Sequence, residues 1–545
     1  MSYPFIYLYD RALTWFWNSR YENLEVLNFE EIRKIAPSTS LIFSPCHRSH
    51  IDYLALSYLL YYKDLMLPQI VAGKNLNLPL VGPLLRKGGA FFMRRSFSNN
   101  RLYSVVFYEH LRKLMQRGHS IEFFPEGGRS RSGKLMPPRP GIISMILRSF
   151  LGMDEKQVSF VPISINYEKV LEGNSYINEV MGAEKKKENL KDIFSVFRDF
   201  RNYLGEAYLQ FGEPISLNAL LEEYPLDDFS SEKDWLFKVT PVLGKRIMTN
   251  INNSTVVTST ALFSLAILNS DGFSISKQEL VSRIELLKSL LEEDKYSAKT
   301  LICEKTGEEI IDQMRKLGFL SKEDINDRIS LTNLEAAKLS FYRNNISHLL
   351  IFESLICGFF QYQKEIAKED LLQSIKMIYP FLKEEFFLKW DEVDLDQIIA
   401  LKLKKLINKN LIFEDSNFFK RPDFKSKEFY ETQSLGKLVQ PSIDRFYVLI
   451  SQLWKNSEEH ISKNELERNS LEILKNLEKT QARLTPEFSE KWMFDVFLNR
   501  LIENKYVRED DKGMLYPTRI TQRLEKDANK FLEPNWLKEL SKSTT

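Results

Sequence analysis

Two residue types suited to proton transfer lie close together in the stretch SPCHRSHIDYLALSYLL, from Ser44 to Leu60. The chain has only six histidines, and one of them, His47, is followed five positions later by Asp52. A carboxylate that near can orient an imidazole, fix its tautomer and stabilise the imidazolium that forms on proton transfer. The pair is therefore a candidate general base. His50 should turn away from it and be structural. Because His47 and Asp52 are expected at a turn outside the core, replacing either should spare the fold.

A second group of residues has the chemistry of phosphate binding. The stretch FFPEGGRSRSGKL, from Phe123 to Leu135, combines glycines, hydroxyls and cations. Glycines let the backbone approach a ligand closely, and arginine and lysine bind phosphate through charge-assisted hydrogen bonds. We expect the phosphate contacts to come from Arg94 (in GGAFFMRRSF), Arg129, Arg131 and Lys134. We expect support for the same ligand from Glu126, Gly127, Gly128, Ser130 and Pro162. Glu126 should brace the glycine-rich turn or hold a ligand hydroxyl.

Three other active-site types fit this pattern poorly. Gly128 to Lys134 matches the first part of a Walker A loop, but Leu135 occupies the position of the Mg²⁺-binding hydroxyl, and prolines follow where a helix should begin. The segment GGRSRSG is not a G-x-S-x-G nucleophile elbow, because Ser132 replaces the second glycine. The third type is a cysteine nucleophile activated by a histidine. Cys46 is adjacent to His47 and should therefore point to the opposite side of the strand, into the core.

The elements that must position these residues alternate between strands and helices. The segments SLIFSP, QIVAG, GAFFMR, SIEFFPEG, VSFVPISINY and AYLQFGEP have the character of strands, and DYLALSYLLYY and NNRLYSVVFYEHLRKLMQRG have helical periodicity. This alternation predicts an α/β domain over residues 38–255 with a mixed, mostly parallel sheet flanked by helices. Ligands gather at strand ends in such sheets, and the polar clusters fall there.

Residues 256–545 are predicted to form a mainly helical C-terminal region. Three of its segments share a helix end, an apolar pair, a charged turn and a second short strand: MRKLGFLSKEDINDRISLT, LKKLINKNLIFEDSNFFKRPD and LNRLIENKYVREDDKGMLYPT. This rhythm fits winged-helix-like units, and it also fits independent helix-plus-hairpin pieces. The two interpretations stay open at this point.

Composition excludes several classes of protein. With 76 Lys and Arg against 74 Asp and Glu, the net charge of +2 lacks the basic excess of a nucleic-acid-binding protein. Three scattered cysteines argue against a disulfide framework or a structural zinc site and favour a reducing compartment. No segment is apolar for long enough to predict a membrane-spanning helix. Residues 1–37 should form an amphipathic helical segment, whose aromatic part, Tyr3–Trp17, suits either a membrane interface or docking on the fold.

Four blocks in this order, PCHRSHIDY, GGAFFMRRSF, PEGGRSRSGKL and VPISINYEKVLEG, resemble the glycerol-3-phosphate acyltransferases of the bacterial PlsB type and their dihydroxyacetone-phosphate acyltransferase relatives. FYRNNISHLL and IYPFLKEEFFLKW resemble the C-terminal region of the same family. The resemblance implies the glycerolipid acyltransferase fold. Members usually carry a long region before the histidine block, whereas 46 residues precede His47 here, which puts any membrane-binding or regulatory role of that region in doubt.

The resemblance also implies a reaction. An acyl group would pass from acyl-CoA or acyl-carrier protein to the sn-1 hydroxyl of glycerol 3-phosphate, with His47 as general base and Asp52 orienting it. Neither a metal nor a cofactor is expected, because a thiolate is a good leaving group. Alternatives are a dihydroxyacetone-phosphate acyltransferase and a degenerate, non-catalytic lipid-binding scaffold. Since donor and product are amphiphiles, the expected location is peripheral, on the cytoplasmic side of the inner membrane.

Overall fold

The computed structural model of the chain describes residues 2–77, 79, 81–94, 100–153, 157–173, 203–321, 327–456, 460–480, 490–527, 530 and 532. These residues form two compact units. Unit 1 consists of residues 1–260, 295–304 and 312–320, and unit 2 consists of residues 261–294, 305–311 and 321–545. The sequence placed the change of organisation after residue 255. Unit 1 also includes residues near 300, because β11 (Leu301–Ile302) pairs with β9 (Val256–Val257).

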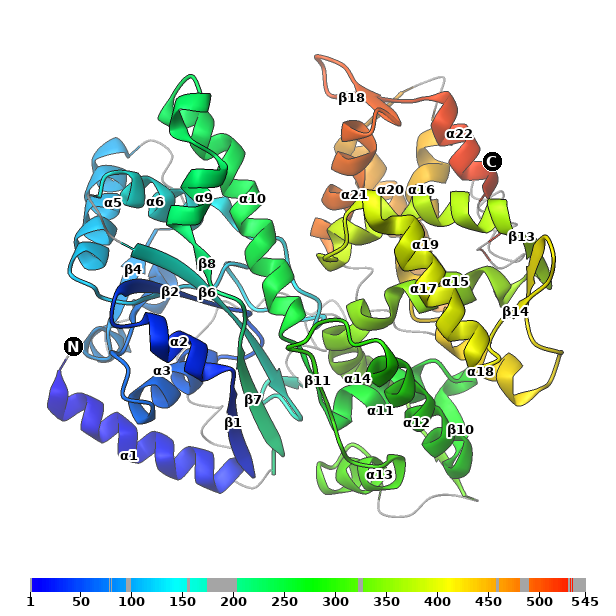
Figure 1. Cartoon of the computed structure of the whole chain (residues 1–545), viewed down its shortest axis with the longest axis horizontal. Coiled ribbons are helices and arrows are strands. Elements are labelled where there is room, and N and C mark those ends of the chain that lie inside the picture. Colours follow the sequence, from blue (N-terminus) through cyan, green and yellow to red (C-terminus); the bar gives the residue numbers. More distant parts are fainter. Residues whose placement is uncertain are drawn as a thin grey trace. The chain divides into compact units, whose positions relative to one another are not determined.

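Unit 1 is built on an eight-stranded sheet (Figure 1). Its strands, in sheet order, are β1 (Asn23–Leu27), β7 (Glu206–Phe211), β6 (Gln157–Tyr167), β2 (Thr39–Pro45), β5 (Ile121–Glu122), β3 (Gln69–Gly73) and β4 (Ala90–Met93), with β8 (Ile215–Ser216) on β6. The β6–β7 and β6–β8 pairs are antiparallel and the other five pairs are parallel. The predicted mixed, mostly parallel sheet is thus confirmed. The central strand β2 is buried along nearly its whole length, as expected for an inner strand of a mostly parallel sheet covered on both faces.

Helices surround this sheet and agree with the periodicity of the sequence. They are α1 (Tyr3–Arg20), α2 (Phe29–Ile35), α3 (Asp52–Tyr62), α4 (Val81–Lys87), α5 (Arg101–Gln116), α6 (Pro140–Leu151), α9 (Leu217–Glu223) and α10 (Glu232–Asn253). The predicted α3 and α5 are confirmed. The prediction of a helical segment over residues 1–37 is wrong in part, because residues 23–27 form the strand β1. That strand has little local signal, and its partner β7 lies far along the chain.

The first helix, α1, has one face in the core and another on the surface. Phe16 and Trp17 are buried, and the helix packs against α3 and β1 (Figure 1). In contrast, Tyr7, Leu8 and Trp15 are 51%, 63% and 56% exposed. This helix therefore belongs to the fold and still presents apolar side chains to its surroundings. Among the described helices, none combines the length and the apolar character needed to cross a membrane.

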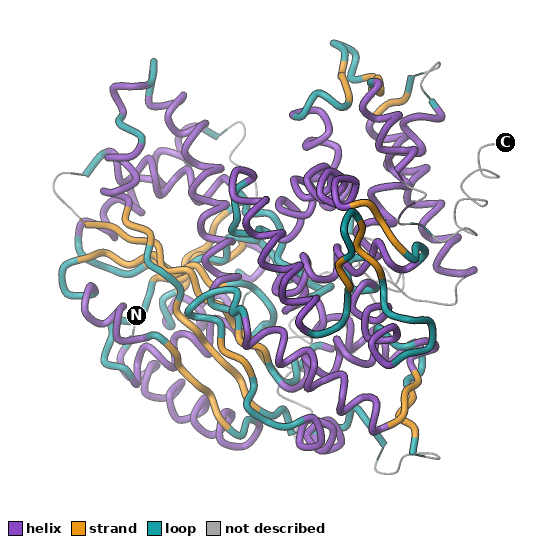
Figure 2. The backbone as a smooth tube through the Cα atoms, turned by 45° about the vertical axis from the view of Figure 1, so that its right-hand side comes forward, coloured by secondary structure: helices purple, strands orange, loops and turns teal. Residues whose placement is uncertain are grey.

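Unit 2 is dominated by helices, as predicted, and its strands are short (Figure 2). Two of its segments have the strand–helix–helix–hairpin order of a winged-helix unit and form a three-stranded sheet. The first contains β13 (Glu365–Ala367), α16 (Lys368–Phe386), α17 (Leu395–Asn408), β14 (Phe413–Glu414) and β15 (Phe418–Lys420). The second contains β16 (Ile461–Ser462), α20 (Lys463–Thr480), α21 (Lys491–Glu503), β17 (Val507–Glu509) and β18 (Met514–Pro517).

An earlier segment of unit 2 has a related order with a two-stranded sheet. It consists of β10 (Ser274–Ser276), α12 (Lys277–Glu293), the first part of α13 (Gly307–Lys316) and β12 (Arg328–Ser330), and the rest of α13 falls in unit 1. The other helices, in chain order, are α11 (Ser259–Leu268), α14 (Asn333–Ile346), α15 (Ile351–Gly358), α18 (Lys427–Gly436), α19 (Gln440–Lys455) and α22 (Arg519–Asp527).

Candidate active site

The site lies where parallel strands of unit 1 end. Because β2, β3, β4, β5 and β6 run in the same direction, their carboxyl ends meet at one edge of the sheet. The turn from β2 into α3 carries His47 and Asp52, β5 leads into the glycine-rich loop, and β6 ends at Tyr167. Three of the four sequence blocks thus end on the neighbouring strands β6, β2 and β5 at this edge.

The central contact of the site joins His47 to Asp52. His47 Nδ1 lies 2.9 Å from Asp52 Oδ2, and because a carboxylate oxygen can only accept, Nδ1 carries the proton. The other ring nitrogen, Nε2, is then the one with a lone pair. The His47 ring also stacks on Phe124 with their centroids 4.0 Å apart, and the His47 side chain is 16% exposed. The imidazole is thus held in one orientation, as a general base requires.

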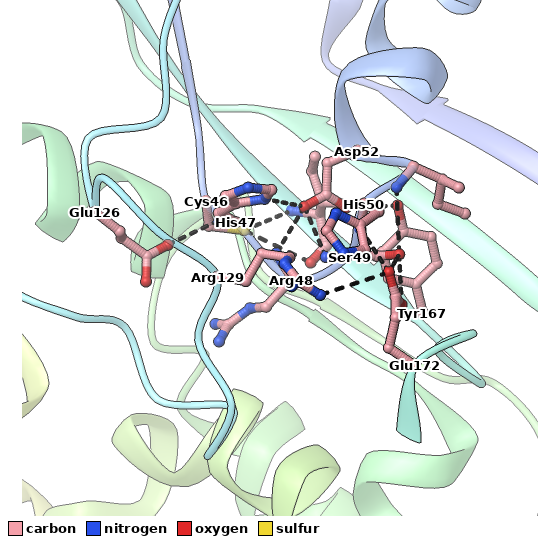
Figure 3. Close-up of polar contacts among 12 residues, drawn as sticks. Cys46, His47, Arg48, Ser49, His50, Asp52, Glu126, Arg129, Tyr167 and Glu172 are labelled. Atoms are coloured by element: carbon pink, nitrogen blue, oxygen red, sulfur yellow. Dashed lines mark hydrogen bonds and ion pairs between the residues drawn. The ribbon is translucent and has the colours of Figure 1, made fainter. Parts of the chain in front are cut away.

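Asp52 is held by several donors at once. Its Oδ2 accepts hydrogen bonds from the backbone N–H groups of Arg48 (2.6 Å) and Ser49 (2.8 Å), and its Oδ1 accepts one from the Tyr167 hydroxyl (2.7 Å) (Figure 3). Both oxygens therefore act as acceptors, which is the role of an ionised carboxylate. Asp52 is fully buried. The expectation that Asp52 lies outside the core is wrong. Because four donors depend on it, its replacement by alanine should cost stability.

Glu126 ties the glycine-rich loop to the catalytic turn. Its Oε1 accepts from the His47 N–H at 2.7 Å, and its Oε2 accepts from the Met136 N–H at 3.0 Å. Burial raises the pKa of Glu126 above its usual value, and the nearby Arg48 and these two N–H groups oppose the shift. Both carboxylate oxygens are engaged with backbone donors. Of the two roles considered for Glu126, the structure displays the bracing one.

The glycines of the loop differ in their surroundings. Gly127 has φ +68°, and a Cβ at this position would approach the Arg139 side chain to 2.7 Å. This position therefore needs glycine for conformational and steric reasons. A Cβ at Gly128 would meet open space. Gly127 is thus required by the fold of the loop, whereas Gly128 leaves room beside it.

The rest of the loop is fastened to the turn by backbone contacts. The Ser130 N–H donates to the His47 carbonyl at 3.0 Å, and the Ser130 hydroxyl donates to the Lys134 carbonyl at 2.5 Å. Arg48, which is buried, donates through its guanidinium to the Gly133 carbonyl. Ser130 therefore shapes the loop and the turn together. The side chain of Lys134 is buried.

A buried acid, Glu172, holds the other side of the turn. Its carboxylate accepts from the Ser49 hydroxyl (2.8 and 3.0 Å) and from the His50 N–H (2.7 Å). Arg129 Nη1 lies 3.9 Å from Glu172 Oε1. Burial raises the pKa of Glu172, and the contacts with His50, Arg129 and Ser49 oppose the shift. Figure 3 shows Glu126 and Glu172 approaching the turn from opposite sides. Arg129 thus lies beside the turn, and the carboxylate of Glu172 partly offsets its positive charge.

Arg94 is not brought to this turn. It follows β4, the edge strand, which lies three strands from β2, a distance of roughly 14 Å. Its guanidinium carbon lies 4.7 Å from the centre of the Tyr103 ring, and its side chain is exposed. Arg131 lies in the glycine-rich loop and is half-buried. Pro162 is within β6, opposite Ser44 of β2, and is therefore in the sheet itself.

Cys46 points into the core, as expected. Its Sγ contacts the backbone of Ile165 on β6, accepting from the N–H at 3.2 Å and lying 3.6 Å from the carbonyl oxygen. Burial raises the pKa of the Cys46 thiol to about 12. A thiol in this setting is not a nucleophile at neutral pH.

Three residues of the site were not identified from the sequence. Tyr167 and Glu172 stand at and just after the end of β6, and Phe124 follows β5. These residues could be recognised only by their position at the end of a strand that neighbours β2. Because β6 follows β2 by more than a hundred residues, the sequence does not reveal that the two strands are neighbours in the sheet. Among the described residues, no group of three or more His, Cys, Asp and Glu side chains is placed to hold a metal ion.

Two family models match this chain. A family model described as acyltransferase matches residues 25–166, and one described as glycerol-3-phosphate acyltransferase C-terminal region matches residues 176–510. The first covers the catalytic turn, the glycine-rich loop and most of β6. The second covers more than half of the chain.

Curated relatives carry the same name. A glycerol-3-phosphate acyltransferase of Pseudomonas paraeruginosa is 35% identical over 541 residues, which are 98% of this chain and 65% of the relative. One of Pseudomonas fluorescens is 35% identical over 522 residues, 94% of this chain and 62% of the relative. This chain thus spans less than two thirds of the length of these relatives. The crystal structure of the 1-acyl-sn-glycerophosphate acyltransferase PlsC from Thermotoga maritima is matched at 18% identity with a TM-score of 0.26, over 45% of this chain and 77% of that one.

Proposed function

This chain belongs to the glycerol-3-phosphate acyltransferase family, and we propose that it transfers a fatty acyl group from acyl-CoA or acyl-carrier protein to the sn-1 hydroxyl of glycerol 3-phosphate. The observation that carries the proposal is the His47–Asp52 contact of 2.9 Å, with Nε2 left as proton acceptor beside a loop rich in arginine. A scaffold that only binds lipid has no need of an oriented base.

The chemistry follows from the orientation of the ring. Nε2 of His47 takes the proton of the acceptor hydroxyl as its oxygen attacks the thioester carbonyl carbon. The imidazolium that forms is stabilised by Asp52 through Nδ1–H. When the tetrahedral intermediate collapses, the carbon–sulfur bond breaks, and the imidazolium returns the proton to the leaving thiolate. The products are an ester and a free thiol, with all atoms and electrons accounted for, so the mechanism requires no cofactor.

The phosphate of the acceptor needs cations near the turn. Arg129 supports this role best, because it lies beside Glu172 at the edge of the turn, and Arg131 and Lys134 belong to the same loop. Arg94 would have to leave the Tyr103 ring to take part. A phosphate held here also explains a preference for phosphorylated acceptors, since an uncharged glycerol gives the arginines nothing to bind.

Replacing Arg129 with alanine should raise KM for glycerol 3-phosphate by roughly ten- to a hundredfold, because a charge-assisted contact to phosphate is worth ~1.5–3 kcal/mol. KM for the acyl donor should stay within about twofold. The measurement is steady-state kinetics with each substrate varied in turn. Arg112→Ala is the matched control, since Arg112 pairs with Glu109 on α5.

The Arg94→Ala variant separates two arrangements of the phosphate site. A KM change as large as that of Arg129→Ala would show that Arg94 reaches the acceptor in the complex. If Arg129→Ala instead raises the donor KM and leaves the acceptor KM unchanged, the loop binds the donor and the assignment of the phosphate site is wrong.

The reaction itself is tested by an acyl-transfer assay with the purified chain. Glycerol 3-phosphate and dihydroxyacetone phosphate are offered as acceptors, and acyl-CoA and acyl-carrier protein as donors. We expect the higher kcat/KM with glycerol 3-phosphate. A preference for dihydroxyacetone phosphate would favour the related acyltransferase. Lipid binding without turnover in any combination would favour the non-catalytic scaffold.

The exposed face of α1 supports attachment to a membrane surface. Tyr7, Leu8 and Trp15 are aromatic or apolar and exposed, and exposed Arg11 lies on the same helix, a combination suited to an anionic lipid interface. Both the donor tail and the lysophosphatidate product are amphiphiles. We therefore place the enzyme on the cytoplasmic side of the inner membrane as a peripheral protein.

Replacing Tyr7, Leu8 and Trp15 together with serine should weaken binding to anionic vesicles by roughly ten- to a hundredfold, because less apolar area enters the interface. Activity on detergent-dispersed donor should be retained. The measurement is cosedimentation with phosphatidylglycerol vesicles. Phe237→Ser on α10 is the control, because Phe237 is 85% exposed. Point changes are preferable to deleting the helix, since Phe16 and Trp17 belong to the core. Unchanged sedimentation of the triple variant would refute the role of α1.

A further inference from the structure

Tyr167 contacts the catalytic carboxylate from the strand next to it. It is the last residue of β6, and its hydroxyl donates to Asp52 Oδ1 at 2.7 Å. The other oxygen of Asp52 is shared by His47 and two backbone N–H groups. In the part of the chain that the structure describes, the phenol is the one donor to Oδ1. Together with the three donors on Oδ2 it holds the carboxylate in one orientation (Figure 3).

The phenol is itself held in place. Tyr167 is buried, its backbone is paired in β6 with Ala207 of β7, and its ring lies 6.1 Å from that of Tyr21, which follows α1. Burial, together with the charge of Asp52, raises the pKa of Tyr167 well above its usual range. The hydroxyl is thus a protonated donor throughout the working pH range.

We propose that Tyr167 is a positioning residue for the general base, acting through Asp52 by fixing the orientation and the charge distribution of its carboxylate. This inference rests on the proposed function of the His47–Asp52 pair. Removing the hydroxyl has two consequences. The carboxylate loses its donor on Oδ1, and its charge acts more strongly on the Nδ1–H of His47. The imidazolium is then favoured, so the pKa of His47 rises.

The other charged and titratable groups around this centre are unchanged by the substitution. They are Tyr21, Cys46, Arg48, Tyr53, Glu122 on β5, Glu126, Arg129 and Glu172. Any shift in the titration of His47 on loss of the phenol therefore comes through Asp52.

The test compares Tyr167→Phe with a matched control, Tyr208→Phe. Tyr208 on β7 donates to Glu206 Oε2 at 2.7 Å, so the control loses the same kind of bond. It lies opposite Asn166 and thus projects from the sheet face opposite to that of Tyr167. We expect Tyr167→Phe to lower kcat about tenfold with both KM values within twofold, and to move the acidic limb of the kcat/KM profile to higher pH. The control should behave as wild type.

A second measurement does not depend on turnover. The rate at which diethyl pyrocarbonate modifies His47, read against a His47→Gln background, follows the neutral imidazole, and its pH dependence reports the pKa of His47. A pKa raised in Tyr167→Phe supports the inference even if the wild type proves inactive, an outcome that would count against the proposed function alone. An active wild type with unchanged kcat and unchanged His47 titration in Tyr167→Phe would overturn the inference and leave the function standing.

A variant that retains the phenol guards against loss of folding. If Tyr167→Phe does not fold, 3-fluorotyrosine at position 167 supplies a stronger donor in nearly the same volume. The pKa of His47 should then fall below that of wild type. No change, or a rise, would contradict the role assigned to the hydroxyl.

Discussion

Replacing His47 with alanine should lower kcat for acyl transfer by roughly 10²–10⁴-fold, the range that a positioned general base contributes. The hydroxyl of the acceptor would have to lose its proton to water. The fold should persist, because the side chain of His47 is partly exposed and its described side-chain hydrogen bond is the one to Asp52. The measurement is single-turnover acyl transfer, with circular dichroism and thermal unfolding as checks of folding.

His50→Ala provides the comparison for this variant, because it removes an imidazole from the same turn. The contact of His50 with Glu172 uses the backbone N–H, which alanine retains, so its loss of activity should be far smaller. A folded His47→Ala protein with turnover near that of wild type would refute the general-base mechanism.

Replacing Asp52 with asparagine should lower kcat by roughly 10⁴-fold, the scale that this change has in Ser-His-Asp triads. The amide oxygen can still accept from the N–H groups of Arg48 and Ser49, and the Tyr167 hydroxyl can turn to accept from the amide nitrogen. The shape is thus kept and the charge that stabilises the imidazolium is lost. We expect unaltered KM for both substrates, measured by varying each in turn while the other is saturating.

Asp52→Ala separates charge from structure. Alanine leaves two backbone donors and a phenol without partners in a buried place, where each such group costs about 1–3 kcal/mol. The free energy of unfolding in urea should therefore fall in Asp52→Ala and stay nearly constant in Asp52→Asn. Equal stability of the two variants would show that the burial of Asp52 does not demand its hydrogen bonds.

The parts of the site that the sequence predicted are those encoded locally. The strand-to-helix turn with His47 and Asp52 spans a few residues, and the bracing role of Glu126 was among the expectations because it adjoins the glycines. Tyr167 and Glu172 could not be found in this way, since the order of strands in the sheet decides which strand end lies beside β2. The same reason separates Arg94 from the turn, because β3 and β5 lie between β4 and β2.

The two faces of α1 show a second limit of sequence reasoning. The aromatic pattern of Tyr3–Trp17 is compatible with a membrane interface and with docking on the fold. The structure shows Phe16 and Trp17 in the core with Tyr7 and Trp15 at the surface. A helix this rich in aromatic residues has enough of them for both a buried face and an exposed face. The periodicity of the sequence alone does not show which aromatic residues belong to which face.

The pairing of β1 with β7 has a consequence for the order in which the protein folds during synthesis. Asn23 lies opposite Glu206, so the partner strand of β1 is synthesised roughly 180 residues after β1. At ribosomal rates of about 5–20 residues per second, this delay is on the order of 10–40 s. During that interval Phe16 and Trp17 have no finished core to enter. Residues near 300 complete unit 1 later still, because β11 pairs with β9. The segment that contains α1 and β1 is therefore a candidate substrate for chaperones. Until the sheet is complete, the apolar side chains of α1 stay exposed and are prone to aggregation.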